Sequence, residues 1–174
     1  MSKRNDPHYT WNLKLLFKDL KDSEVKKQRD AAEKEVKRFV KKWKDRQDYL
    51  QDSVILKEAL DEYELWSRKF GTDGGYSYYL YLASALDQND PVLKAEINKV
   101  TESSIKLYNE IQFFLLNLTK VDKKTQQKFL KSKELREYKH FLEKTFRYAP
   151  HTLTDSEERI MNFKSKPAHS NWTR

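Results

Sequence analysis

The sequence predicts an all-α fold, an antiparallel helical bundle of about six to seven helices forming one domain over residues 1–174. Apolar side chains recur at steps of three and four in several long stretches, as they do along one face of a helix. No stretch of strand length alternates between apolar and polar residues. Asp, Ser or Thr also precedes several of these stretches, where helix caps belong. The length of 174 residues fits about one domain.

Composition points to an ordered but strongly solvated chain. Charged residues make up 36% and the mean hydropathy is −0.98, whereas aromatic residues at 13% favour a packed core. The absence of cysteine excludes disulfides and thiolate metal sites. No apolar run approaches the ~20 residues of a membrane span, and the first ten residues lack the apolar stretch of a secretory signal. We therefore expect a cytoplasmic protein with no membrane contact.

The net charge of +8 is distributed unevenly along the chain. Residues 1–50 hold 15 basic and 9 acidic groups, residues 51–119 hold 6 and 11, and residues 120–147 hold 10 and 4. These parts can attract one another on folding, so nucleic acid is an unlikely partner and solvated helix faces are the favoured interpretation. The alternative is a basic helical module that binds nucleic acid or an acidic protein partner through 1–50 and 120–147. Convergence of the basic groups on one face would favour that alternative.

Two antiparallel helices are predicted in the first part of the chain. After a short apolar segment near Trp11 and Phe17, a helix begins at Ser23. Its apolar face is formed by Val25, Ala32, Val36, Phe39, Trp43 and Leu50. Asp52 or Ser53 can cap the next helix, and Gly71 stands where a left-handed cap would end it. The apolar face of that second helix is formed by Leu56, Ala59, Tyr63, Trp66 and Phe70.

A glycine-containing turn and a tyrosine-rich helix follow. The stretch 72–75 lacks the Lys-Ser/Thr of a phosphate-binding loop, so we interpret it as an interhelical turn. A third helix is expected over 76–86. Its tyrosines favour partly buried packing with a solvated hydroxyl over a peptide-binding groove.

The longest helix is predicted to begin at Pro91. Asp90 is its expected cap and Pro91 its first residue. Its apolar pattern continues to Leu118, close to 30 residues without a helix breaker. Asp122 should then cap a short basic helix that contains Phe129 and Leu130.

A helix, a tight loop and a second helix are predicted over 133–160. Apolar residues from Leu135 to Phe146 form one helix face, and Pro150 disfavours helical geometry at Ala149. Thr154 stands three residues before Glu157, which is the spacing of a capping box. We expect the second helix to end near Phe163.

This segment resembles the N-terminal region of the oligoendopeptidase F group of zinc metallopeptidases, which is related to thimet oligopeptidase. The residues that carry the resemblance, for which we expect a structural role, are Leu135, Tyr138, Leu142, Arg147, Pro150, His151, Leu153, Thr154, Glu157 and Glu158. Trp11-Asn12-Leu13, Asn89-Asp90-Pro91 and Asn171-Trp172 are similar in order and rough spacing. The resemblance thus spans nearly the whole chain, and its specific part runs from Leu135 to Glu158.

No catalytic, cofactor-binding or metal-ligating residue is predicted. A peptidase of this group needs H-E-x-x-H, which places two histidines one helical turn apart on one zinc ion. The four histidines, His8, His140, His151 and His169, do not form that motif. The pair His140 and Glu143 lacks a third ligand, and we interpret it as a surface pair. An independent hydrolase built on His140, Glu143 and His151 is therefore disfavoured.

The resemblance implies zinc and oligopeptide cleavage for a full-length family member, with no cofactor on this chain. We expect this chain to be inactive alone, a fragment whose catalytic domain is on the same or a neighbouring polypeptide. Leu153, Ile160, Met161, Phe163 and Trp172 are expected to pack on that domain or to support self-association.

Overall fold

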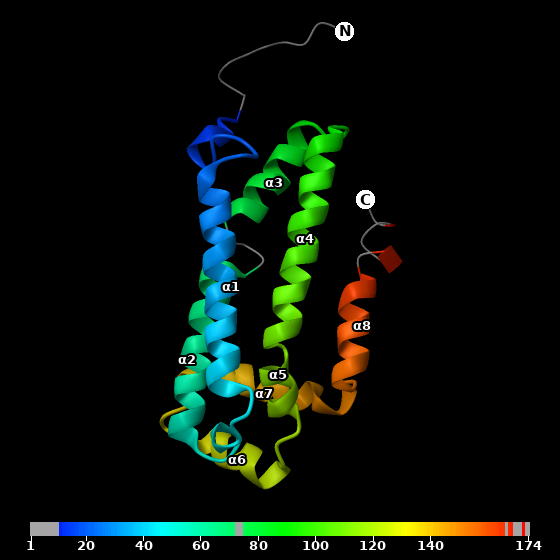
Figure 1. Cartoon of the computed structure of the whole chain (residues 1–174). Helices are drawn as coiled ribbons and strands as arrows, with labels where there is room; N and C mark the ends of the chain where they lie inside the picture. The colour runs from blue at the N-terminus through cyan, green and yellow to red at the C-terminus, as the bar shows by residue number, and fades with distance from the viewer. Residues whose placement is uncertain (1–10, 72–74, 166, 169–171, 173–174) are drawn as a thin grey trace, which may run out of the picture.

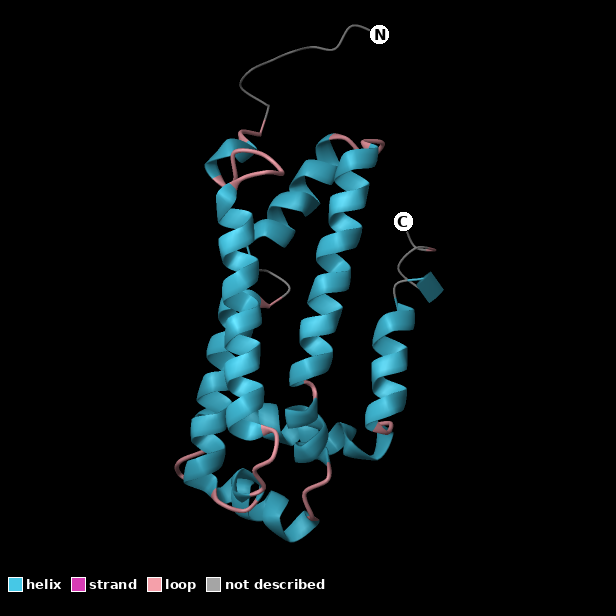
Figure 2. Cartoon of the chain, viewed as in Figure 1, coloured by secondary structure: helices cyan, strands magenta, loops and turns pink. Residues whose placement is uncertain are grey.

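The structure, a computed structural model, describes residues 11–71, 75–165, 167, 168 and 172, and most of these residues are helical. No strand occurs there, so the all-α prediction is confirmed (Figure 2). The α-helices in chain order are α1 (Ser23–Trp43), α2 (Ser53–Phe70), α3 (Gly75–Leu86), α4 (Pro91–Ile111), α5 (Phe113–Thr119), α6 (Lys123–Lys131), α7 (Lys139–Tyr148) and α8 (Asp155–Ser165). Four 3₁₀ helices precede or connect the α-helices of the described residues: η1 (Leu13–Leu15), η2 (Asp48–Leu50), η3 (Arg136–Tyr138) and η4 (Ala149–His151). Within these residues no helix has the length and apolar character needed to span a bilayer.

Helices α1 and α2 form an antiparallel hairpin (Figure 1). The predicted cap of α2 is confirmed, because the Asp52 carboxylate accepts hydrogen bonds from the backbone N–H groups of Val54 and Ile55. The prediction that α1 continues to Leu50 is wrong, since α1 ends at Trp43 and Leu50 lies in η2. Asp48 bonds the backbone N–H of Tyr49, and such local side-chain bonds compete with helix continuation. The turn brings Tyr49 into the core.

The left-handed conformation predicted at Gly71 is also wrong. Its φ of −65° and ψ of −176° are extended. A Cβ at this position would lie 2.3 Å from the carbonyl oxygen of Ser67, so the glycine is explained by close backbone approach and not by its φ angle. The predicted turn continues into residues 72–74, which lie outside the described residues.

Helices α3 and α4 form a second antiparallel pair (Figure 1). Asp90 caps α4 as predicted, with Pro91 in its first turn. The single long helix predicted up to Leu118 is wrong, because α4 ends at Ile111 and α5 begins at Phe113. The stretch from Phe113 to Leu118 is apolar on nearly every side, so packing into the core sets its direction without a proline or glycine to mark the break.

Helices α5, α6 and α7 close the end of the bundle that is remote from η1 (Figure 1). Asp122 caps α6 as predicted, accepting from Lys124 N–H and Thr125 N–H. The continuous helix predicted from Leu135 is wrong. Leu135 stands before η3, whose i to i+3 bond from Tyr138 N–H to Leu135 carbonyl precedes α7.

Two separate groups of buried side chains hold the bundle together. The lower core gathers residues of α1, α2 and the α5–α7 end: Phe39, Trp43, Tyr49, Leu56, Ala59, Leu60, Ile111, Phe114, Leu118, Val121, Phe129, Leu135 and Leu142. The upper core joins the segment before α1 to α3 and α4: Phe17, Tyr76, Tyr79, Leu80 and Leu93. The segment before α1 is therefore anchored by Phe17, whereas Trp11 and Leu16 are exposed.

Candidate functional site

The apolar residues that carry the family resemblance belong to the lower core. Leu135 and Leu142 are buried there, and Tyr138 packs against it. Their neighbours in space include the buried α1 and α2 residues of the same core. These three residues therefore attach the 133–148 segment to the α1–α2 hairpin.

Tyr138 also makes a polar contact with α2. Its hydroxyl lies 2.7 Å from Asp61 Oδ1 and 2.8 Å from Glu64 Oε2. Burial raises the pKa of Tyr138, and the two carboxylates raise it further. The hydroxyl therefore stays protonated and donates to these carboxylates, which also pair with Lys57 and Arg68. The sequence does not indicate this contact, because its partners lie 77 and 74 positions away.

The second part of the family segment builds the start of α8. The predicted capping box is present: Thr154 N–H donates to Glu157 Oε2 at 2.9 Å, and Glu157 N–H reaches Thr154 Oγ1 at 3.4 Å. Glu158 Oε1 accepts from the N–H of Leu153 at 3.0 Å. A hydrogen bond from the Thr154 hydroxyl lowers the pKa of Glu157, and the hydrogen bond from the backbone N–H of Thr154 lowers it further. Both glutamates thus fix the entry into α8.

The remaining residues of the resemblance lie at the surface. Arg147, Pro150 and His151 are exposed, the last two in η4. His140 is likewise exposed, on α7. Among the described residues no group of three or more His, Cys, Asp and Glu side chains is placed to hold a metal. The described residues therefore offer no set of three ligands for a zinc ion, and His8 and His169 lie outside the described part.

Helix α8 contacts α4 through a polar contact and buries none of its own residues. The Asn162 amide donates to Asn109 Oδ1 at 2.7 Å and to Gln112 Oε1 at 2.6 Å. Asn109 and Gln112 are the buried polar residues of the described chain. Apolar side chains along α8 and the turn before it are exposed: Tyr148, Leu153, Ile160, Met161 and Phe163. The helix is thus attached by hydrogen bonds and leaves its apolar side chains uncovered.

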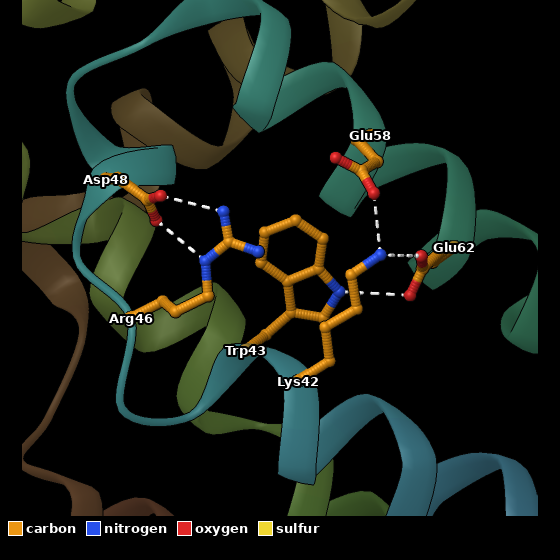
Figure 3. Close-up of polar contacts among 6 residues, drawn as sticks. All are labelled: Lys42, Trp43, Arg46, Asp48, Glu58 and Glu62. Carbon is orange, nitrogen blue, oxygen red and sulfur yellow. Dashed lines mark hydrogen bonds and ion pairs between the residues drawn. The ribbon is translucent and has the colours of Figure 1, made fainter.

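A charged network encloses Trp43 at the end of α1 (Figure 3). Trp43 Nε1 donates to Glu62 Oε2 at 3.0 Å, and Lys42 lies between Glu58 and Glu62. Arg46 stacks on the same ring, 4.4 Å from its centroid, and pairs with Asp48. Every carboxylate of this network has a cationic partner, so the network seals the lower core and offers no free acid or base. Sequence reasoning missed it because Glu58 and Glu62 lie on the next helix.

A small cavity of about 160 Å³ lies beside this network, between α1 and α2. Phe39, Trp66 and Phe70 are among its lining residues. Arg38 and Glu35, which also line it, pair with each other. Of the tyrosines of α3, Tyr76 and Tyr79 are stacked in the upper core, whereas Tyr78 and Tyr81 are exposed.

Comparison with known proteins assigns part of the chain. Residues 117–174 match the family model described as oligopeptidase F, for the N-terminal region of M3 peptidases. No curated protein and no solved structure matches the chain. The matched residues include α6, α7, α8 and the capping box described above. The resemblance predicted for the segment from Leu135 to Glu158 is thus confirmed, and residues 117–174 are similar to the N-terminal region of oligopeptidase F.

Proposed function

We propose that this chain is the non-catalytic helical region of an oligopeptidase F-type metallopeptidase and that it binds the catalytic domain through α8. The match over residues 117–174 supports the first part of the proposal. Peptide cleavage, with its zinc ion and general base, would then belong to that catalytic domain. This chain supplies a folded surface beside it.

The exposed apolar side chains of α8 are the observation that carries the binding surface. Ile160, Met161 and Phe163 are 52%, 55% and 50% exposed within about one turn of a helix that buries none of its residues. Clustered apolar groups of this kind are typical of protein contact sites. Asn162 contacts α4, so its side of α8 faces the bundle. Ile160 lies on the opposite side of the helix and faces outward.

Binding to a separately produced oligopeptidase F catalytic domain tests the proposal. Titration calorimetry should detect a complex with the full chain. Because each buried side chain of this size contributes about 1.5–3 kcal/mol, the double substitution Ile160→Asp and Phe163→Asp should weaken binding at least ~100-fold. Tyr81→Asp, an equally exposed apolar position on α3, is the matched control and should bind normally. Failure of the full chain to bind, or an equal loss in the control, would refute α8 as the contact.

A further inference from the structure

Basic side chains gather on the outer faces of α6 and α7. We define the basic face as Lys123, Lys124, Lys128 and Lys131 of α6 with Lys139, Lys144 and Arg147 of α7. All seven are exposed. At about 100° per residue, the members of each helix fall within an arc of roughly 140°. One acidic residue, Glu143, shares this face.

The same core orients both helices. Phe129 and Leu130 on the inner side of α6 pack in the lower core, as do Leu142 and Phe146 on the inner side of α7. The two helices are in contact with each other, and they lie at the closed end of the bundle (Figure 1). Burial of the apolar sides therefore turns the basic sides of both helices to solvent.

The positive charge of the basic face is not neutralised within the described chain. None of its seven side chains forms an ion pair with a carboxylate of the described residues. The acidic residues of α2 pair elsewhere: Glu58 and Glu62 with Lys42, Asp61 with Lys57, and Glu64 with Arg68. A second copy of the chain is therefore a poor partner for this face, because its α2 carboxylates are already paired.

The composition of the basic face suits a partner with regularly spaced negative charges. Six of its seven cations are lysines, which bind phosphate as compact point charges and need no fixed bidentate geometry. Each helix presents its cations over roughly 12 Å, a length that spans three to four phosphates of one duplex strand. No aromatic residue belongs to the basic face, so stacking on unpaired bases is not provided.

We propose that the basic face binds the phosphate backbone of double-stranded nucleic acid, without sequence preference. This inference is independent of the α8 contact and uses different residues. The expectation that nucleic acid is an unlikely partner assumed neutralisation between oppositely charged parts of the chain. Lys42 of α1 does pair with Glu58 and Glu62 of α2. No ion pair of the described residues neutralises the basic side chains of α6 or α7 in the same way.

Fluorescence anisotropy with a labelled 20-base-pair duplex at ~50 mM salt tests the proposal on the full chain. Binding should weaken steeply with salt, because neutralised phosphates release counterions. Substituting Lys124→Gln with Lys131→Gln, or Lys139→Gln with Lys144→Gln, should reduce the slope of log K against log salt by about 1 for each lysine removed. The control Lys94→Gln with Lys106→Gln removes two exposed lysines of α4 and should leave the slope unchanged.

Competition distinguishes the other polyanions. Poly-glutamate and vesicles rich in phosphatidylserine should displace the duplex only at much higher charge concentration. Equal or better binding of either would assign the face to an acidic protein or a membrane and overturn the proposal. No duplex binding at ~50 mM salt would overturn it too, as would an equal change in the α4 control. Far-ultraviolet circular dichroism of each variant checks that the helices remain folded.

Discussion

The lower and upper cores of the bundle differ in how many parts of the chain they join. The lower core combines α1 and α2 with residues from α4 to α7, and its aromatic contacts centre on the rings of Phe39, Tyr49 and Phe114. The upper core joins only the segment before α1 to α3 and α4. Residues 117–174 contribute to the lower core and to none of the upper core. The family-matched segment therefore depends on the α1–α2 hairpin for its packing.

Removal of the central ring of the lower core should have the largest effect. Phe114 is fully buried and contacts Phe39, Tyr49 and Tyr63, so Phe114→Ala should lower the free energy of unfolding by about 3–5 kcal/mol. Urea unfolding followed by circular dichroism measures this. A loss below about 1 kcal/mol would mean that the lower core does not carry the stability assigned to it.

The matching substitution in the upper core should cost less and act locally. Phe17 packs edge-on against Tyr76 and Tyr79 at the edge of the bundle, so Phe17→Ala should cost about 2 kcal/mol. Hydrogen exchange should increase in α3 and in the segment before α1, while the amides of α5–α7 keep their protection. Equal loss of protection in both regions would show that the two cores unfold as one unit.

Acid should reveal a smaller difference, at the network around Trp43. Burial raises the pKa of Glu62, but the hydrogen bonds of Lys42 and Trp43 outweigh burial and lower the pKa below that of an ordinary glutamate. A carboxylate with a lowered pKa stabilises the fold at pH values above its unfolded-state pKa, and this contribution is lost as the pH falls through the folded-state pKa. Glu62→Gln should therefore flatten the acid side of a plot of melting temperature against pH. Glu102→Gln, an exposed position on α4, should leave that profile unchanged.

Local signals in the sequence predicted much of this structure. The caps Asp52, Asp90, Asp122 and Thr154 were each predicted from side chains that bond nearby backbone, and all are present. The class of fold and the burial of Leu135 and Leu142 follow from apolar periodicity.

Features that depend on distant partners were not predictable. The break after Ile111 has no proline or glycine to mark it, because packing of α5 in the lower core determines it. The contacts of Tyr138 with α2 and of Asn162 with α4 join residues that are 50 or more positions apart in the sequence. Their polar side chains give no periodic signal.

The contact of Asn162 sets the angular phase of α8. Glu158 and Asn162 are the partly buried residues of α8, and they lie one turn apart on the side facing α4. Ile160 lies about 160° from Asn162 around the helix, and Met161 and Phe163 lie about 100° to either side. If one residue were inserted between Thr154 and Asn162, the capped start of α8 would rotate by about 100° around the helix axis relative to the apolar side chains of α8. The length of this interval is therefore as constrained as its composition, and insertions or deletions should be tolerated after Ser165 sooner than within it.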